Sequence, residues 1–176
     1  NEDGGIDNTT ANLEALAKID SLECIHSSSL VTINELIRHM PNLKTLVCFK
    51  NALIELDVSK NTKLKKLNCS YNKLPILDLS NNIKLEELDC STNPLTNLDL
   101  SKNIELTSLT CFINFLTNLD LSKNIKLEFL NCSHRYLPDL DLSKNIELKI
   151  LYCYNSNLTN LADLSNNIKL EELYCY

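Results

Sequence analysis

Eight cysteines have the widest chemical repertoire among the side chains of this sequence. From Cys48 onward they recur at intervals of 21 or 22 residues, and the full set is Cys24, Cys48, Cys69, Cys90, Cys111, Cys132, Cys153 and Cys175. A zinc site needs four ligands that converge on one point, and a disulfide needs two sulfurs in a crossed geometry. One cysteine per repeat instead predicts a column of thiols that pack as small apolar groups. We expect reduced and mostly buried cysteines from Cys48 through Cys175, and no metal site.

Aspartates form a second column, with one carboxylate in each repeat: Asp57, Asp78, Asp99, Asp120, Asp141 and Asp163. Stacked carboxylates supply oxygen ligands of the kind that calcium prefers. The alternative is structural, because aspartate also accepts hydrogen bonds from backbone amides at corners and keeps an outer face soluble. We favour the structural role, since nothing in the sequence resembles the Gly-Asp repeats of calcium-binding β-rolls.

Groups suited to catalysis are scarce in this chain. The histidines are His26, His39 and His134, and none has a nucleophile and an orienting acid at the spacing of a known motif. The sequence therefore predicts a protein that is not an enzyme and uses no cofactor. A net charge of −6 without a run of basic residues disfavours nucleic acid as a partner. Polar residues recur every two or three positions, so no segment approaches the ~18 apolar residues of a membrane span.

The elements that position these columns follow from one repeated stretch, of which residues 85–105 are a complete copy. Self-similarity at a fixed period of this length is typical of a solenoid. A leucine stands two residues before each repeat cysteine, at Leu46, Leu67, Leu88, Leu109, Leu130, Leu151 and Leu173. This alternation predicts about eight short parallel strands, in which Leu and Cys point inward and the residues on either side of Cys point outward. The Leu-Asp-Leu-Ser stretch repeats the alternation and predicts a second, shorter parallel strand.

The pattern L-x-x-L-x-C-x-x-N-x-L resembles the conserved half of a leucine-rich repeat, with cysteine at a strand position usually held by leucine. The match covers residues 43–176, and the whole repeat is similar to those of bacterial surface leucine-rich-repeat proteins, including internalin-like ones and those abundant in gut Bacteroidetes. The resemblance implies an α/β fold. It implies a right-handed leucine-rich-repeat solenoid with a parallel β-sheet on the concave face, a short second strand or irregular segment on the convex side, and an N-terminal helical cap.

The corners of the repeat carry asparagine rather than glycine. The resemblance implies that Asn51, Asn72, Asn93 and Asn114 form a buried ladder that hydrogen-bonds the backbone of adjacent coils. The column breaks at Arg135 and Ser156, so we expect altered turns there. Because asparagine tolerates left-handed backbone, we expect the asparagines themselves to make the turns.

The chain divides into three parts by composition. Residues 1–9 contain both glycines and little apolar surface, which predicts a flexible leader. Residues 10–42 predict an N-terminal helical cap and a first irregular repeat, and residues 43–176 the leucine-rich repeats of 21–22 residues, the last one incomplete. The polar lead is what would remain after removal of a signal or lipoprotein segment, although a shortened expression product would look the same. We therefore expect an extracellular or cell-surface protein.

Two helices are predicted within the N-terminal part. The Ala-rich sequence after Thr10 has helical propensity and apolar spacing that suits a short capping helix. A second helical segment follows, in which Thr32 and Glu35 are spaced as a capping box and Pro41 provides a stop.

Aromatic residues gather toward the C-terminal end at positions that the repeat predicts to face outward. With two polar neighbours, the candidate ligand-binding residues of the concave face are Phe112, Phe115, Phe129, His134, Arg135, Tyr136, Tyr152, Tyr154, Tyr174 and Tyr176. Aromatic residues and arginine are enriched at binding hot spots, and an exposed apolar patch is typical of an interaction site. The alternative is that these side chains pack beneath a C-terminal segment or a neighbouring molecule.

These observations predict a non-enzymatic module that binds a protein or a glycan, of the surface or secreted adhesin type. Two alternatives stay open. One is a recognition module of a larger enzyme or effector whose catalytic domain lies outside this chain, and the other is a structural spacer. No polar capping segment follows the last strand, so self-association through the C-terminal edge is also expected.

Overall fold

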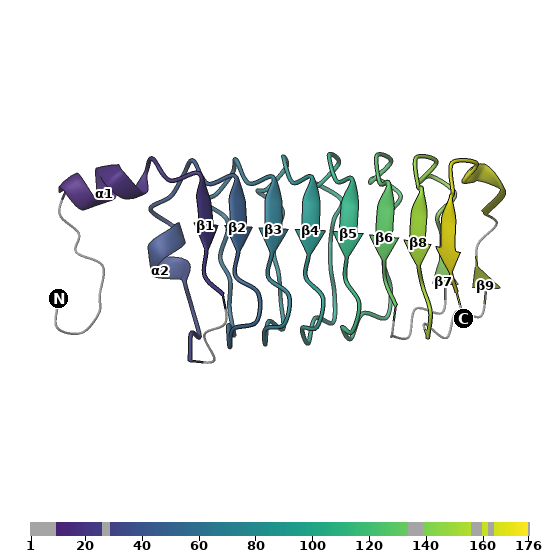
Figure 1. Ribbon diagram of the computed structural model, residues 1–176, viewed down its shortest axis with the longest axis horizontal. Coiled ribbons are helices and arrows are strands. Elements are labelled where there is room, and N and C mark those ends of the chain that lie inside the picture. Colours follow the sequence, from purple (N-terminus) through teal and green to yellow (C-terminus); the bar gives the residue numbers. More distant parts are fainter. Residues whose placement is uncertain (1–9, 26–28, 134–138, 156–159, 162–163, 176) are drawn as a thin grey trace.

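The computed structural model describes residues 10–25, 29–133, 139–155, 160–161 and 164–175, which wind into a solenoid (Figure 1). Eight strands lie side by side in one parallel sheet, in the order β1-β2-β3-β4-β5-β6-β8-β10. Their bounds are β1 (Ser21–Glu23), β2 (Thr45–Val47), β3 (Lys66–Asn68), β4 (Glu87–Asp89), β5 (Ser108–Thr110), β6 (Phe129–Asn131), β8 (Ile150–Tyr152) and β10 (Glu172–Tyr174). The predicted parallel sheet of about eight strands is therefore confirmed.

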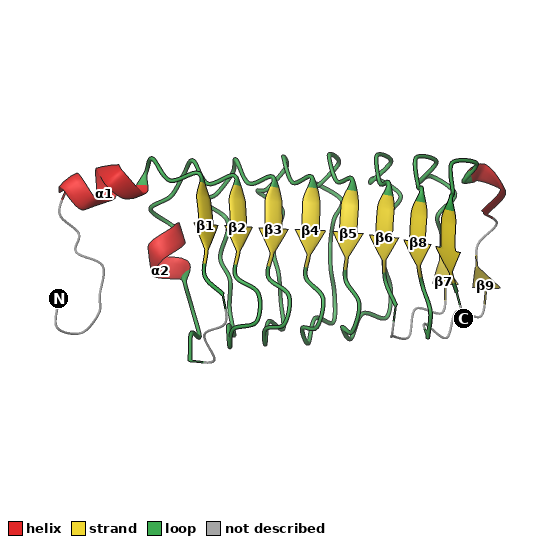
Figure 2. Ribbon diagram, viewed as in Figure 1, coloured by secondary structure: helices red, strands yellow, loops and turns green. Residues whose placement is uncertain are grey.

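Little regular structure lies outside this sheet, as Figure 2 shows by its loops. The helix predicted after Thr10 is present as α1 (Thr10–Leu16), and α2 (Asn34–Ile37) follows β1. The predicted second strand appears only near the C-terminal end, where β7 (Asp139–Leu140) pairs in parallel with β9 (Asn160–Leu161). A single 3-10 turn, η1 (Leu164–Asn166), precedes the last strand. In the other described coils the side opposite the sheet is irregular.

The register stacks equivalent residues of successive repeats directly on one another. Leu46 pairs with Leu67, Leu67 with Leu88, and so on to Leu151 with Leu173. Because side chains of a strand alternate between its two faces, every strand position becomes a row that runs along the solenoid. One row faces the core and the rows beside it form the outer surface of the sheet, which we call the sheet face.

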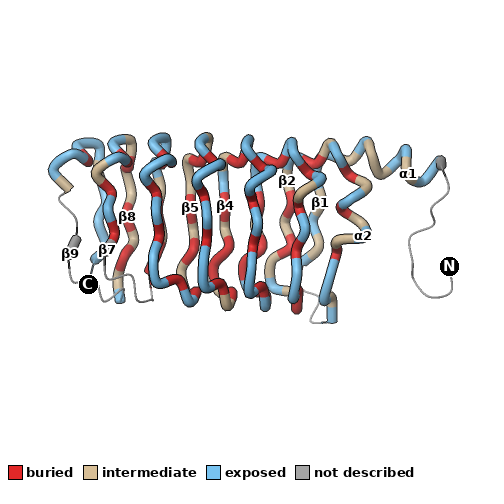
Figure 3. The backbone as a smooth tube through the Cα atoms, turned by 180° about the vertical axis from the view of Figure 1, so that it is seen from behind, coloured by how far each residue is buried: buried red, intermediate tan, exposed pale blue. Residues whose placement is uncertain are grey.

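The core consists of leucine and cysteine rows from both halves of the coil. Six strand leucines from Leu46 to Leu151 are at most 3% exposed, and the Leu-Asp-Leu leucines of the second half are also buried. Figure 3 shows the buried segments recurring from coil to coil. The last strand differs: Leu173 is 42% exposed, because no described strand lies beyond β10 to cover it.

The asparagine ladder that the resemblance implies is present in the described coils. Asn72 is typical: its Nδ2 donates to the backbone oxygens of Cys48 and Cys69 at 2.9 and 3.0 Å, and its Oδ1 accepts from Leu53 N–H at 3.0 Å. Each such amide joins one coil to the preceding coil and satisfies backbone groups that a buried corner would otherwise leave without partners.

A second asparagine ladder at the opposite corner was missed in the sequence, although its signal is a recurring Ser-x-Asn. Its members are Asn61, Asn82, Asn103, Asn124, Asn145 and Asn167, all buried. Asn103 Nδ2 donates to the backbone oxygens of Leu79 and Asn82 at 3.1 and 3.0 Å. The Oδ1 atoms of this second ladder have no hydrogen-bond partner among the described residues.

The prediction that the ladder asparagines themselves make the left-handed turns is wrong. Among the described residues, positive φ values of 51–57° occur instead at Lys50, Tyr71, Thr92, Ile113 and Asn155. In the first four of these corners that residue directly precedes the ladder asparagine. The asparagine side chain must point inward to bridge two coils, so the reversal occurs one residue earlier. There the backbone N–H is held by the next coil, as in the 2.9 Å bond from Tyr71 N to Ser91 O. Arg135 and Ser156 lie outside the described residues.

The capping box predicted at the second helix is also absent. Thr32 Oγ1 accepts from Asn34 N–H at 3.3 Å, while Ile33 occupies the N-cap position and makes no side-chain cap. Glu35 is paired with Arg38 at 3.0 Å rather than with the backbone at Thr32. A capping box needs the glutamate three residues after the N-cap residue. Here the N-cap is Ile33 and the helix begins at Asn34, so Glu35 is only two residues after the N-cap.

Candidate ligand-binding face

Three predicted binding residues lie together at the C-terminal end of the sheet face. Phe129 on β6 and Tyr152 on β8 have ring centroids 5.9 Å apart with a 45° tilt. Tyr152 and Tyr174 on β10 stack with centroids 4.5 Å apart and ring planes 1° from parallel. We call Phe129, Tyr152 and Tyr174 the aromatic patch.

Tyr152 is the central member of this patch and contacts both other rings. Its hydroxyl donates to Glu172 Oε2 at 3.5 Å. Desolvation raises the pKa of the Tyr152 phenol, and the neighbouring Tyr174 and Glu172 add to this shift. The phenol therefore stays protonated at neutral pH and can donate a hydrogen bond.

At three of the positions directly after the cysteine the side chain does not face outward as the alternation predicts. Ser70, Ser91 and Ser133 occupy this row and are at most 2% exposed, and Phe112 is half-buried. The chain bends into its left-handed turn at the next residue, so the strand alternation ends at the cysteine. Tyr154 follows its cysteine in the same way and is also half-buried.

The remaining predicted site residues lie either off the strands of the sheet or outside the described residues. Phe115 is 50% exposed, but it follows the corner Asn114 and belongs to no strand of the sheet. His134, Arg135, Tyr136 and Tyr176 lie outside the described residues.

The N-terminal half of the sheet face is polar. Ion pairs cross between neighbouring coils: Lys65 Nζ lies 2.6 Å from Glu86 Oε1, and Lys66 Nζ lies 2.6 Å from Glu87 Oε1. All four side chains are about half exposed, so each pair contributes little to stability. A depression of about 270 Å³ lies across strands β2 to β5. The sequence did not predict this depression, because its shape depends on which side chains of neighbouring strands lie next to one another.

A row of anchored polar side chains crosses this half. Asn68 Oδ1 accepts from Ser70 N–H at 3.1 Å and from Ser70 Oγ–H at 2.7 Å. Asp89 makes the same two bonds to Ser91, at 3.0 and 2.6 Å. The sequence signal is the triplet Asn/Asp-Cys-Ser, which sequence reasoning did not use.

The cysteine column forms a line of inert thiols beneath the sheet face. All eight cysteines are free, and Cys48 to Cys153 are buried. Burial raises the pKa of Cys48 to about 12 and that of Cys153 to about 11. Cys175 departs from the prediction and is exposed, for the same reason as Leu173. In the described part of the chain, no group of three or more His, Cys, Asp or Glu side chains is placed to hold a metal ion.

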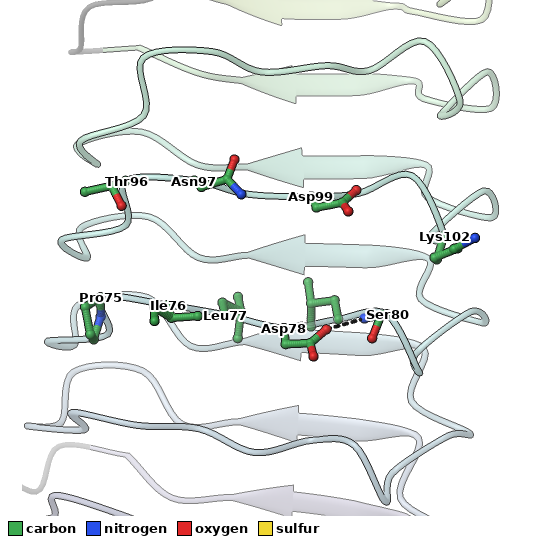
Figure 4. A pocket seen from close by; sticks show the side chains of 10 residues that line it. Pro75, Ile76, Leu77, Asp78, Ser80, Thr96, Asn97, Asp99 and Lys102 are labelled. Carbon is green, nitrogen blue, oxygen red and sulfur yellow. Dashed lines mark hydrogen bonds between the residues drawn. The ribbon is translucent and has the colours of Figure 1, made fainter.

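The aspartate column lies on the side opposite the sheet face and makes the predicted corner hydrogen bonds. Asp78 Oδ1 accepts from Ser80 N–H at 2.9 Å (Figure 4), and Asp57, Asp99, Asp120 and Asp141 bond the serine two residues on in the same way. These hydrogen bonds lower the pKa of the carboxyl groups. Asp163 lies outside the described residues.

A shallow groove of about 370 Å³ lies beside this column, between two coils. Figure 4 shows Pro75 and Ile76 on one coil and Thr96 and Asn97 on the next. Ile76 is 74% exposed. The sheet face is therefore not the sole surface with apolar character.

None of the helices among the described residues is long and apolar enough to cross a membrane.

Comparison with solved structures places this architecture among bacterial leucine-rich-repeat proteins. The functional domain of InlJ from Listeria monocytogenes, described as including a cysteine ladder, matches with a TM-score of 0.78 at 38% identity, over 93% of this chain and 41% of that one. A leucine-rich-repeat protein of Leptospira interrogans matches with a TM-score of 0.76 at 21% identity, over 93% and 50%. The internalin inlF of L. monocytogenes matches with a TM-score of 0.69 at 18% identity, over 93% and 63%.

The two likenesses below 25% identity show the fold alone. This chain spans less than two thirds of each of these three proteins. A scan against protein-family models and a search of curated proteins each found no match.

The repeats, the single parallel sheet and these neighbours define the class of protein. The chain is a leucine-rich-repeat solenoid, and its structural neighbours are internalin-type proteins. Such neighbours support a protein-interaction module in general.

Proposed function

We propose that this chain binds a protein ligand through the aromatic patch, outside the bacterial cell or on its surface. The observation that carries the proposal is the run of three rings on three neighbouring strands, with contacts of 5.9 and 4.5 Å. Tyrosine is enriched at hot spots, because it buries a large area at a low cost in conformational entropy and keeps a hydroxyl for hydrogen bonding. The resemblance to bacterial surface proteins supports the location.

The orientation of the rings favours a protein over a glycan. The rings of Tyr152 and Tyr174 are parallel and stacked, so each ring covers the face that the other ring turns toward it. A ligand approaching the sheet face therefore meets ring edges and hydroxyl groups, which suit hydrogen bonds and edge-to-face contacts. A sugar ring stacks on an aromatic face, and the stack leaves at most the outer face of Tyr174 for such a contact.

The test compares two single substitutions that each remove one aromatic ring, a half-buried one at Tyr152 and an exposed one at Phe115. We expect Tyr152→Ala to weaken binding by a few kcal/mol, since hot-spot truncations typically cost about 2 kcal/mol or more. Phe115→Ala is the matched control, because its ring is exposed but lies off the sheet. The wild-type chain is first screened on arrays of purified proteins and of glycans, and the affinity of each variant for the selected ligand is then measured by calorimetry.

Three results would contradict the proposal. Binding that survives Tyr152→Ala unchanged would remove the patch as the contact surface. Selection of glycans alone would assign the ligand to the other chemical class. The absence of any selected ligand on either array would favour a spacer.

A further inference from the structure

The depression in the polar half of the sheet face contains one carboxylate that the surrounding charges do not neutralise. Its lining includes Lys66, Asn68, Glu87, Asp89, Ser108 and Thr110. Lys66 is engaged by Glu87 at 2.6 Å, and the adjacent Lys65 by Glu86 at the same distance. For Asp89, the described residues provide no ion pair.

The negative charge of Asp89 acts over several coils. Beside burial, it contributes to the raised pKa values of the thiols of Cys69, Cys90 and Cys111 on three successive coils. An uncompensated charge in a concave, partly desolvated site attracts and orients ions of opposite sign more strongly than a charge on an open surface. Lys66, Glu87 and Asp89 are the charged residues that line the depression, so its lining carries a net charge of −1.

Asp89 is also held in a fixed orientation. Its Oδ1 accepts two hydrogen bonds from Ser91, at 3.0 Å from N–H and 2.6 Å from Oγ–H. These bonds restrict the side chain, while Oδ2 accepts no hydrogen bond from the described residues. A pre-organised acceptor loses little conformational entropy when a ligand binds. Hydroxyl groups of Ser108 and Thr110 line the same depression and add further acceptors.

We propose that this depression is a second subsite, which takes a cationic lysine or arginine side chain of the protein bound at the aromatic patch. The inference rests on the proposed function for the identity of the partner. Asp89 is on β4 and Phe129 is on β6, so the two subsites lie two strand steps apart, or roughly 10 Å. One ligand surface of ordinary size reaches both. A charge at this subsite selects among partners and aligns the one that binds.

The test uses small cations as probes of the intact chain. N-acetyl-arginine amide, N-acetyl-lysine amide and the neutral isostere N-acetyl-citrulline amide are titrated separately while the backbone amide resonances are followed by NMR. We expect saturable shifts at residues 87–89 and 108–110 with arginine or lysine and no saturable shifts with citrulline. The tighter of the two cations identifies the side chain that the subsite takes.

Two substitutions separate the subsite from general charge effects. Asp89→Asn is expected to weaken the cation at least tenfold and to leave the fold intact. Asparagine already stands at the equivalent Asn68 and Asn131, where it bonds the following serine N–H at 3.1 and 3.3 Å. Asp120→Asn makes the same charge change on the opposite side and is expected to leave binding unchanged.

Three outcomes would overturn the subsite. They are equal shifts with citrulline, unchanged affinity in Asp89→Asn, and an equal loss in Asp120→Asn. The aromatic patch is tested independently of the subsite, because Tyr152→Ala is expected to leave binding of the arginine and lysine probes unchanged. If binding of the protein ligand depends on Tyr152 but neither cation binds, the subsite is refuted and the proposed function stands.

Discussion

The two asparagine ladders make different demands on their side chains, and single alanine substitutions should distinguish them. Asn93 stands in the first ladder and Asn103 in the second, and both are at most 5% exposed. Asn93 Nδ2 donates to the backbone oxygen of Cys69 in the preceding coil and to those of Cys90 and Ser91 in its own coil. Asn103 Nδ2 donates to two backbone oxygens of the preceding coil. The difference lies in Oδ1: that of Asn93 accepts from Leu74 N–H at 3.0 Å, while that of Asn103 has no partner among the described residues.

The structure gives the expected magnitudes. In Asn93→Ala the carbonyl oxygens of Cys69 and Cys90 keep a second bond from neighbouring asparagines of the ladder, but Leu74 N–H loses the one hydrogen-bond acceptor that the described residues give it. An orphaned buried donor costs about 1–3 kcal/mol and each lost hydrogen bond about 1 kcal/mol, so we expect a loss of about 3 kcal/mol. In Asn103→Ala the two carbonyl oxygens keep backbone partners and an unsatisfied oxygen is removed, so we expect a loss of about 1 kcal/mol.

The assay is urea denaturation of both variants and the wild type, followed by circular dichroism. Both variants delete the same side-chain atoms at a buried corner, so we attribute the difference of about 2 kcal/mol to the hydrogen bonds. An equal loss in the two variants, or a larger loss in Asn103→Ala, would refute the reasoning. Such a result would show that the second ladder has a donor for its Oδ1 atoms, such as buried water.

The remaining predictions concern the thiols and the core. A thiol reagent should modify at most Cys24 and Cys175 in the native protein and all eight cysteines after denaturation. An intact mass of the native protein that is lower by two hydrogen atoms for each pair of cysteines would indicate disulfides and contradict this prediction. The pKa of Cys48 rises from 9.0 to about 12 on folding, so the contribution of its thiol to the free energy of unfolding should be fully present below pH 9 and should be lost as the pH rises toward 12. Thermal unfolding at a series of pH values measures this loss. A flat profile would contradict the buried column. Leu130→Ala should cost roughly 2–5 kcal/mol of unfolding free energy, whereas Ile125→Ala, on an exposed side chain, should cost less than about 0.5 kcal/mol.

Periodicity alone was enough to predict the core, because it depends on one rule applied in every coil. Leu88 and Cys90 are buried with one outward residue between them, as the alternation requires. The rule fails at Ser91, since the backbone leaves the strand there and turns at Thr92 with a φ of 52°. The residue type at this position does not predict the turn, because lysine, tyrosine, threonine and isoleucine all adopt the left-handed backbone conformation there.

The candidate site was predictable only in part, because it depends on neighbours in space. Phe129, Tyr152 and Tyr174 could be found from their outward register, but the stacking of two of them follows from ring orientations that no pattern contains. The polar depression arises where rows from four strands meet, and Asp89 stands out only after the ion pairs around it are known. The exposure of Cys175 likewise reflects what lies beside β10 rather than the repeat itself.

Hydrogen–deuterium exchange of the chain bound to its selected protein ligand tests the central claim most directly. If the aromatic patch is the contact surface, binding should slow exchange at β6, β8 and β10, around residues 129–131, 150–152 and 172–174. Exchange on the opposite side, at residues 76–80 and 97–102, should be unaffected. Protection confined to those opposite residues, with the three strands unchanged, would contradict the account and assign recognition to the aspartate side.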